Sequence, residues 1–370
     1  FIYSVIIIYS LNLLLGLFYI LEDYKKTTLI RSEVTNFDNR NVMEYIKDES
    51  SAEKKIYPYL TPREILIKSK NKDFMFVSGL SEQYYAQCNE EGFWKIIRTD
   101  KNGFNNILSS SEYNILLAGD SFADGTCSVS EKEIGKQLTQ KGFDTYSIGF
   151  AGNGPLLTLA SIIEIKNHIK FKNLVWFIYR NDFLDLKWEL TDQRLTKYLE
   201  SDFAGYGIMQ NKKKFDSDYI NFLNSKKGKN KKKFSYKENF FELKFIQKLY
   251  SAIYSSTRSS EIDSKTFVSI FKILDQKNVI DKKNIIIVYL PGYLCFQKEK
   301  DTCIDEFNKI KFASDANRLK SINFIDYINN KNIHFKKLFR FEMPGTHYSN
   351  YGYEVLSNFV VEELIKKGTN

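Results

Sequence analysis

The chain has 370 residues, of which 43% are hydrophobic and 27% charged, and this balance fits a globular protein with a substantial core. Its formal charge of +9 at pH 7 raises the question of a nucleic-acid partner. Much of the excess lies in one Lys-rich tract, Asn211–Phe234, and no zinc-finger, RNA-binding or helix-turn-helix signature accompanies it, so we expect no nucleic acid. We interpret the tract, within an insertion at about 205–236, as a solvated, disordered loop or as a contact for anionic lipid head groups or an acidic glycan.

The first 21 residues, FIYSVIIIYSLNLLLGLFYIL, are almost continuously apolar and carry no charge. Roughly 20 such residues cross a bilayer as a helix. A signal-peptide core is usually shorter, and no small-residue cleavage pattern follows this one. We therefore predict a single-pass transmembrane anchor over residues 1–21; a buried core helix is the alternative.

Residues 22–110 form a predicted N-terminal extension. Residues 22–70 are polar and charged with scattered apolar positions, which indicates a stalk followed by a small ordered region. Residues 74–110 contain MFVSGL, CNEEGFWKIIRTD and GFNNI, which favour short strands and turns packed on the main body.

From Tyr113 onward, short apolar runs alternate with amphipathic stretches, so we predict strands that alternate with helices. The predicted strands are YNILLAG (113–119), DTYSIGF (144–150), NLVWFIYR (173–180), IIIVYLPG (285–292) and NFIDY (323–327). The predicted helices cover 131–142, 155–169, 238–256, 261–278 and 352–368. This alternation predicts an α/β domain over residues 111–368 whose parallel sheet is covered on both faces.

Polar residues follow the first three predicted strands, as GDS (119–121), GFAGNGP (149–155) and RND (180–182). Ligands of such sheets bind beyond the carboxyl ends of the strands. Ser121 is therefore a candidate nucleophile. It needs a base within hydrogen-bond reach and donors for an oxyanion.

Three histidines are available as the base. His168 closes an amphipathic helix and His334 lies in a basic stretch, so we expect both at the surface. His347, in PGTHYSNYG, lies in a turn just before the last helix, a position that points its ring back toward the strand ends. We predict His347 as the base for Ser121.

Three groups are candidate oxyanion donors: the backbone N–H groups of Ser121 and Gly152 and the side-chain amide of Asn181. Gly152 has no side chain, so its backbone can approach a ligand closely. Asn153 is a further candidate donor.

Ser, Gly, Asn and His in this order give the chain a resemblance to the SGNH (GDSL-type) hydrolase family, over about residues 113–366. The family's blocks match, in order, Gly119–Ser121, Gly152, Asn181–Asp182 and His347. Tyr179 stands where the third block usually has Gly. The resemblance implies a three-layer, flavodoxin-like sandwich with a central parallel sheet, preceded by the transmembrane helix, in which Asp120 and Asp182 are structural supports.

The segments CNEEGFW, DKNGFNN, GDSFADGTC, GNGPLLTLA and HYSNYGY are similar to those of membrane-anchored bacterial SGNH proteins. That similarity implies a serine esterase acting on acyl esters of a carbohydrate, with acetyl as the expected acyl group, through a Ser121 acyl-enzyme. It also implies a catalytic domain in the periplasm or outside the cell. GTHYS is similar to a turn of SGNH-like acetyltransferases, so a polysaccharide O-acetyltransferase is one alternative. A non-catalytic glycan-binding or assembly protein of the same fold is another, and a lipase is a more distant one.

The family usually places an Asp two or three residues before the His, where this chain has Gly345 and Pro344. Glu342 is the nearest carboxylate in the sequence. The site is then a Ser–His dyad, a triad completed by Glu342 or another carboxylate, or an impaired site. An orienting acid can change the rate by several orders of magnitude.

The four cysteines are Cys88, Cys127, Cys295 and Cys303. The sequence has neither a C-x-x-C pair nor an H-E-x-x-H cluster, so we expect no metal site and no cofactor. An even count behind a membrane anchor allows two disulfides. Cys295–Cys303 would close a short loop, and Cys88–Cys127 would tie the N-terminal segment to the turn after Ser121. Four unrelated buried thiols are the alternative.

Overall fold

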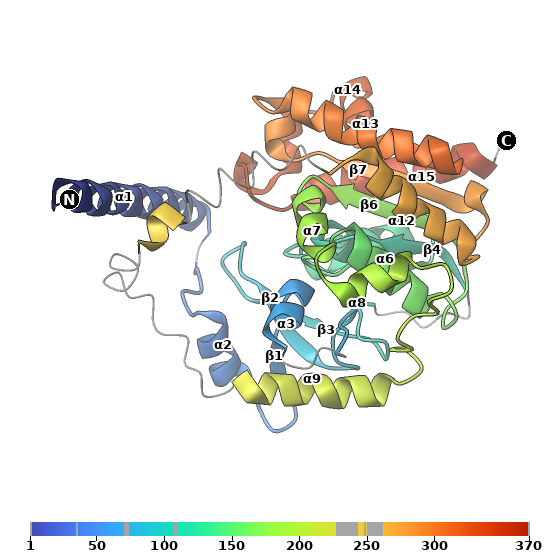
Figure 1. Cartoon of the computed structure of the whole chain (residues 1–370), viewed down its shortest axis with the longest axis horizontal. Coiled ribbons are helices and arrows are strands. Elements are labelled where there is room, and N and C mark those ends of the chain that lie inside the picture. The colour runs from blue at the N-terminus through green and yellow to red at the C-terminus, as the bar shows by residue number, and fades with distance from the viewer. Residues whose placement is uncertain are drawn as a thin grey trace. The chain divides into compact units, whose positions relative to one another are not determined.

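The computed structural model describes residues 2–34, 36–69, 74–106, 110, 112–226, 243–247, 249 and 262–368 (Figure 1). The chain divides into two compact units. One comprises Phe1–Phe37 with Ile220–Ile262, and the other comprises Asp38–Tyr219 with Asp263–Asn370. The predicted nucleophile, oxyanion donors and base all belong to the second unit.

The first unit contains one long helix, α1 (Ile2–Glu33). Its stretch Tyr3–Leu21 is long and apolar enough to cross a membrane, and 11% of that stretch is buried. A membrane anchor and a signal sequence near the N-terminus can both pass this test of length and composition. The helix runs 12 residues beyond the predicted anchor, so the first part of the predicted stalk is helical instead. Within the apolar stretch, the side-chain oxygen of Asn12 accepts a hydrogen bond from the backbone N–H of Ile246 at 3.1 Å.

The second unit is organised around a five-stranded sheet in which every pairing is parallel. Its strands are β4 (Tyr113–Ala118), β5 (Thr145–Ser147), β6 (Phe171–Tyr179), β7 (Ile285–Leu290) and β8 (Lys320–Asn323). They lie side by side in the order β5-β4-β6-β7-β8. The order therefore reverses between β4 and β6, the kind of switch point at which open α/β sheets bind ligands.

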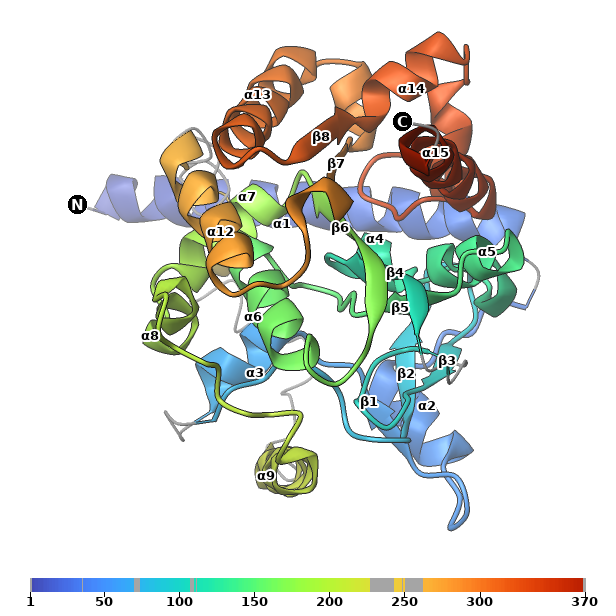
Figure 2. The same cartoon turned by 90° about the vertical axis from the view of Figure 1, so that its right-hand side faces the viewer.

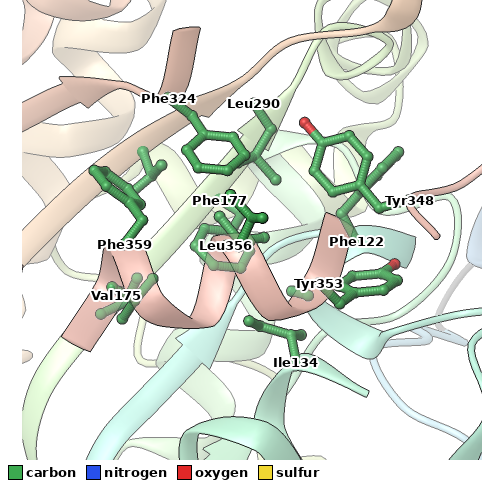
Figure 3. Packing of buried hydrophobic residues seen from close by; sticks show 14 of the residues in the cluster. Phe122, Ile134, Val175, Phe177, Leu290, Phe324, Tyr348, Tyr353, Leu356 and Phe359 are labelled. Carbon is green, nitrogen blue, oxygen red and sulfur yellow. The ribbon is translucent and has the colours of Figure 1, made fainter. Parts of the chain in front are cut away.

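Helices cover both faces of this sheet, as Figure 2 shows. One face is covered by α5 (Ile134–Gln140), α14 (Phe324–Asn330) and α15 (Asn350–Gly368). In Figure 3, Phe324, Phe359 and Leu356 pack over Phe177 and Leu290 of the strands. The other face is covered by α6 (Pro155–Ile165), α12 (Ser264–Gln276) and α13 (Lys300–Asn317). This burial on both faces explains why the strands are continuous apolar runs.

The observed elements agree with most of the predicted ones. Four predicted strands coincide with β4, β5, β6 and β7, and four predicted helices overlap α5, α6, α12 and α15. A short 3₁₀ turn, η1 (Ser130–Lys132), precedes α5 and begins the first of these helices. Of the predicted helix 238–256, most lies outside the described residues, although 244–247 are helical.

The fifth predicted strand is wrong. Residues 324–327 of NFIDY begin α14, and the fifth strand, β8, ends at Asn323. Asn323 also caps the helix, because its side-chain oxygen accepts the backbone N–H of Ile325 at 3.0 Å. α13 is a helix that the apolar pattern does not predict, since its buried positions include the polar Glu306 and Asn317.

The N-terminal extension is a second, three-stranded sheet with two helices. Its elements are α2 (Val42–Glu49), β1 (Ile56–Pro58), α3 (Pro62–Lys68), β2 (Tyr84–Cys88) and β3 (Lys95–Arg98). β2 is central, parallel to β1 and antiparallel to β3. Residues from Asp38 onward belong to the same compact unit as the large sheet. The structural boundary therefore lies near residue 38 and not at residue 110.

Part of the Lys-rich tract is helical, in contrast to the predicted loop. α9 (Lys212–Lys226) carries buried aromatic residues at Phe215 and Tyr219, one helical turn apart. Their rings pack against the rings of Phe74 and Phe76, with centroids 5.0–5.8 Å apart. Lysines with apolar residues at helical spacing therefore form an amphipathic helix here. Residues 227–236 of the predicted insertion lie outside the described residues.

The remaining elements are short and connect the larger ones. They are α4 (Ser121–Asp124), α7 (Asp182–Glu189), α8 (Gln193–Thr196), η2 (Lys197–Leu199), η4 (Lys282–Asn284), η5 (Tyr293–Phe296), η6 (Phe335–Leu338) and η7 (Arg340–Glu342).

Candidate active site

Ser121 lies at the sharp turn between β4 and α4. The turn depends on Gly119, which has a φ of +144° and lies so close to β6 that a Cβ would be 2.8 Å from the carbonyl oxygen of Phe177. Asp120 caps α4 by accepting the backbone N–H of Phe122 at 2.9 Å. The serine residue is 8% exposed, so this turn is largely buried.

The three predicted oxyanion donors follow three neighbouring strands. Ser121, Gly152 and Asn181 come after β4, β5 and β6, at the same edge of the sheet. Among the described residues, neither the N–H of Ser121 nor that of Gly152 donates a hydrogen bond. The Asn181 amide donates one of its hydrogens to Asp185 at 2.8 Å, which leaves the other for a ligand.

Gly152 has a backbone that only glycine adopts easily. Its φ is +83°, and a Cβ there would lie 2.9 Å from the Cβ of Thr61, at the start of α3. The following turn is held by Glu189, whose carboxylate accepts the backbone N–H groups of Gly154 and Leu156 at 2.7 and 2.8 Å. The N-terminal extension and α7 therefore fix the loop that carries one candidate donor.

His347 lies beside the nucleophile turn. Its ring centroid is 5.4 Å from that of Phe122, the residue after Ser121. No hydrogen bond joins Ser121 to His347 among the described residues; the Ser121 hydroxyl donates to Asp120 at 3.4 Å. Catalytic hydrogen bonds are often long before substrate binds. The other two histidines, His168 and His334, are exposed, as expected from the sequence.

The acid beside His347 is Glu90. Its Oε1 atom lies 2.9 Å from Nδ1 of the imidazole, and its Oε2 atom accepts the backbone N–H of His347 at 3.4 Å. Glu342 is one of the acids that the sequence left open, and the structure does not bring it to the imidazole. It is exposed in the turn before His347, with a φ of +48°, and no described hydrogen bond joins it to the imidazole.

Two further contacts hold the segment of Glu90 against the site. Cys88, two residues earlier, forms a disulfide with Cys127, six residues after Ser121. Arg340 is 3% exposed, forms an ion pair with Glu91, and places its Nε atom 4.0 Å from Oε2 of Glu90. The second disulfide joins Cys295 of η5 to Cys303 of α13, and both pairs are those expected from the sequence.

The Glu90–His347 cluster also contains the Cys127 sulfur, and one ligand atom from each residue lies within 4.8 Å of the others. Because Cys127 is in a disulfide, it offers no thiolate. Two protein ligands remain, where zinc sites take three or four. This donor set therefore does not fit a zinc site.

Buried carboxylates surround the nucleophile turn. Burial raises the pKa of Asp120 to about 7, against the opposing effect of the hydrogen bond from Phe122. Burial, together with the charges of Asp120 and Asp185, raises the pKa of Asp182 well above its usual value. The Asp182 carboxylate accepts the backbone N–H of Tyr179 at 3.0 Å and so holds the end of β6.

The pKa of Glu90 is shifted in the opposite direction, below its usual value. Burial raises its pKa, but the hydrogen bond and charge of His347, with the charge of Arg340, outweigh burial and hold the pKa below its usual value. The carboxylate is therefore ionised at neutral pH, as an acid that stabilises an imidazolium must be.

The sequence alone did not identify Glu90, although it carried a usable signal. The predicted Cys88–Cys127 pair would bring the residues just after Cys88 close to the turn after Ser121. Glu90 and Glu91 are two such residues. The predicted Cys88–Cys127 disulfide therefore pointed to Glu90 and Glu91 as candidates for the acid that the sequence did not otherwise identify.

One cavity does not include the predicted site. It has a volume of about 200 Å³ and lies between α5 and β5, lined by residues such as Glu133, Lys136 and Thr145, and none of the predicted site residues lines it.

No protein-family model and no curated protein matches this chain. The resemblance to SGNH hydrolases therefore rests on the residues themselves and on their arrangement at the sheet edge.

Proposed function

We propose that the chain is a membrane-anchored serine esterase of the SGNH type, which acts on acetyl or similarly short acyl esters of a carbohydrate. The observation that carries the proposal is the convergence of Ser121, Gly152 and Asn181 at the ends of adjacent strands, with the ring of His347 beside the Ser121 turn. The five strands of the large sheet, counted along the chain from β4 to β8, lie in the order second, first, third, fourth, fifth. This order, with helices on both faces, supports the flavodoxin-like sandwich that the family resemblance implies.

In the proposed mechanism, Ser121 Oγ attacks the ester carbonyl while His347 accepts its proton. The N–H groups of Ser121 and Gly152 and the amide of Asn181 hold the oxyanion. His347 then protonates the leaving alkoxide. Water, activated by the same imidazole, releases the acyl group from Ser121.

A sugar hydroxyl in place of water would make the same site an O-acyltransferase, which is the second candidate function. A lipase, which would need a wide apolar mouth over Ser121, is a more distant alternative.

The proposed location is the periplasm or the cell exterior, with α1 as the anchor. Two disulfides support an oxidising compartment, because cytosolic thiols are kept reduced. The apolar stretch Tyr3–Leu21 supports attachment to a membrane.

The first prediction is that an organophosphonate ester labels the wild-type protein at Ser121. Ser121→Ala should not be labelled, and His347→Ala should be labelled at least about 10²-fold more slowly, because the serine then lacks its base. Intact-mass spectrometry measures the labelling. His334→Ala is the matched control, since His334 is exposed, and it should react like wild type.

Equal extents of labelling in folded wild type and Ser121→Ala, including no labelling of either, would contradict the proposal and favour a non-catalytic glycan-binding protein. With an active enzyme, acetate release without added glycan favours the esterase. Acetate transfer to an added oligosaccharide favours the acyltransferase.

A further inference from the structure

The imidazole of His347 is held by a carboxylate from a different part of the chain. We propose that Glu90, supplied by the N-terminal three-stranded sheet, is the positioning acid of this site and replaces the Asp that usually precedes the His. The inference rests on the proposed function, in which His347 is the base.

The geometry fixes the ring in the useful tautomer. Glu90 Oε1 lies 2.9 Å from Nδ1, so Nδ1 carries the hydrogen and donates it to the carboxylate. Nε2 then has a free lone pair and can accept the Ser121 proton. The same carboxylate accepts the backbone N–H of His347 at 3.4 Å, so it holds both the ring and its main chain.

The position of Glu90 is secured on both sides. The Cys88–Cys127 disulfide joins the end of β2 covalently to the segment that follows Ser121. On the other side, the buried guanidinium of Arg340 pairs with Glu91 and faces Oε2 of Glu90 at 4.0 Å. Arg340 also donates its backbone N–H to the carbonyl oxygen of His347 at 3.2 Å. One residue therefore contacts both the acid and the base.

Other carboxylates are less suited to this role. Asp120 lies near His347, but its carboxylate caps α4 and accepts the Ser121 hydroxyl. Glu342 is exposed in the turn before His347. This makes Glu342→Gln a matched control, because it removes a nearby charge without touching the imidazole.

The kinetic test compares wild type, Glu90→Gln, Glu90→Asp and Glu342→Gln as full-length chains in detergent. Phosphonate labelling and the kcat and KM for an acetyl ester are measured from about pH 5 to about pH 9. We expect Glu90→Gln to lower kcat and the labelling rate by about 10²- to 10⁴-fold with little change in KM, because a Gln amide favours the wrong tautomer. Glu90→Asp should recover part of the loss, and Glu342→Gln should stay within about twofold of wild type.

A second readout does not depend on activity. The chain has 3 histidines, so ¹⁵N-histidine spectra can be assigned with His168→Gln and His334→Gln. We expect His347 to show the Nδ1–H tautomer in wild type and to lose it in Glu90→Gln. Intact mass verifies that both disulfides remain in each variant.

Each outcome has one meaning. Wild-type kinetics and an unchanged His347 tautomer in Glu90→Gln would overturn the role of Glu90. An equal loss in Glu342→Gln would also overturn it. Wild-type protein that is never labelled would overturn the proposed esterase, while the tautomer spectra would still decide whether Glu90 positions His347.

Discussion

At the scale of single residues, the carboxylates near Ser121 divide into two groups. Glu90 has a lowered pKa because it faces His347 and Arg340, and it is suited to stabilise a cation. Asp120, Asp182 and Glu189 have raised pKa values, chiefly because they are buried, and each accepts backbone N–H groups. These three are structural supports for the turns that carry the candidate donors.

Glu189 gives a prediction on stability and pH. Burial raises its pKa from 4.5 to about 8, against the hydrogen bonds from Leu156 and Gly154. Between these values the unfolded chain has lost the proton while the folded protein keeps it. The folded state binds more protons, so its stabilisation is complete below pH 4.5 and is lost as the pH rises to about 8.

We expect the free energy of unfolding of wild type to fall with rising pH more steeply than that of Glu189→Gln, by at most about 1.4 kcal/mol per pH unit. Urea unfolding at about pH 5 and about pH 7.5 measures the two slopes. Glu189→Gln should be less stable at both, because it loses acceptors for the α6 turn. Parallel slopes would show that Glu189 does not hold a proton in the folded state.

At the scale of elements, the N-terminal three-stranded sheet is part of the candidate site. The end of its β2 strand carries Cys88 and leads to Glu90, and α3 presents Thr61 to Gly152. Tyr59, between β1 and α3, donates its hydroxyl to Asp124 of α4 at 3.1 Å and stacks on Phe150. The large sheet carries the candidate nucleophile and the candidate oxyanion donors, and the small sheet packs against the turns that hold them.

The two disulfides are expected to differ in their effect on stability. Cys88 and Cys127 close a loop with a sequence separation of 39, and Cys295 and Cys303 one of 8. The chain-entropy estimate gives about 4 kcal/mol for the longer loop and about 2.5 kcal/mol for the shorter one.

Replacing both cysteines of a pair with Ala, one pair at a time, and measuring denaturant unfolding tests this order. The pair Cys88→Ala with Cys127→Ala should also slow phosphonate labelling, since Glu90 loses its covalent link. A larger loss of stability from the Cys295–Cys303 pair would contradict the prediction.

At the scale of the whole molecule, the chain combines an apolar helix with a compact α/β unit. The division near residue 38 predicts that the second unit does not need α1 for its fold. We expect full-length protein in the membrane fraction and a chain lacking residues 1–37 in the soluble fraction.

Fractionation by ultracentrifugation, followed by phosphonate labelling of both forms, makes this measurement. Equal labelling rates are expected, because the candidate site lies in the second unit. Aggregation of the shortened chain, with full-length protein soluble without detergent, would instead identify α1 as a core helix.

Local sequence patterns were sufficient to predict the parallel sheet, the alternation of helices and strands and the turn that carries Ser121. These features have local signatures, because a strand buried on both faces is a continuous apolar run and a helix repeats every 3.6 residues. The same local patterns did not predict where β8 ends, because Asn323 both ends this strand and caps α14. They also did not predict α13, because several of its buried positions are polar.

The identity of the acid that faces His347 follows from long-range packing and not from local sequence. Glu90 and His347 are separated by 257 positions in the sequence, and no periodic pattern connects two side chains that meet from separate loops, one after β2 and one before α15. Their contact arises because the Cys88–Cys127 disulfide and the buried Arg340 bring the end of β2 to the edge of the large sheet. The sequence pointed to Ser121 and His347 as candidates, and packing between the N-terminal extension and the large sheet placed Glu90 beside His347.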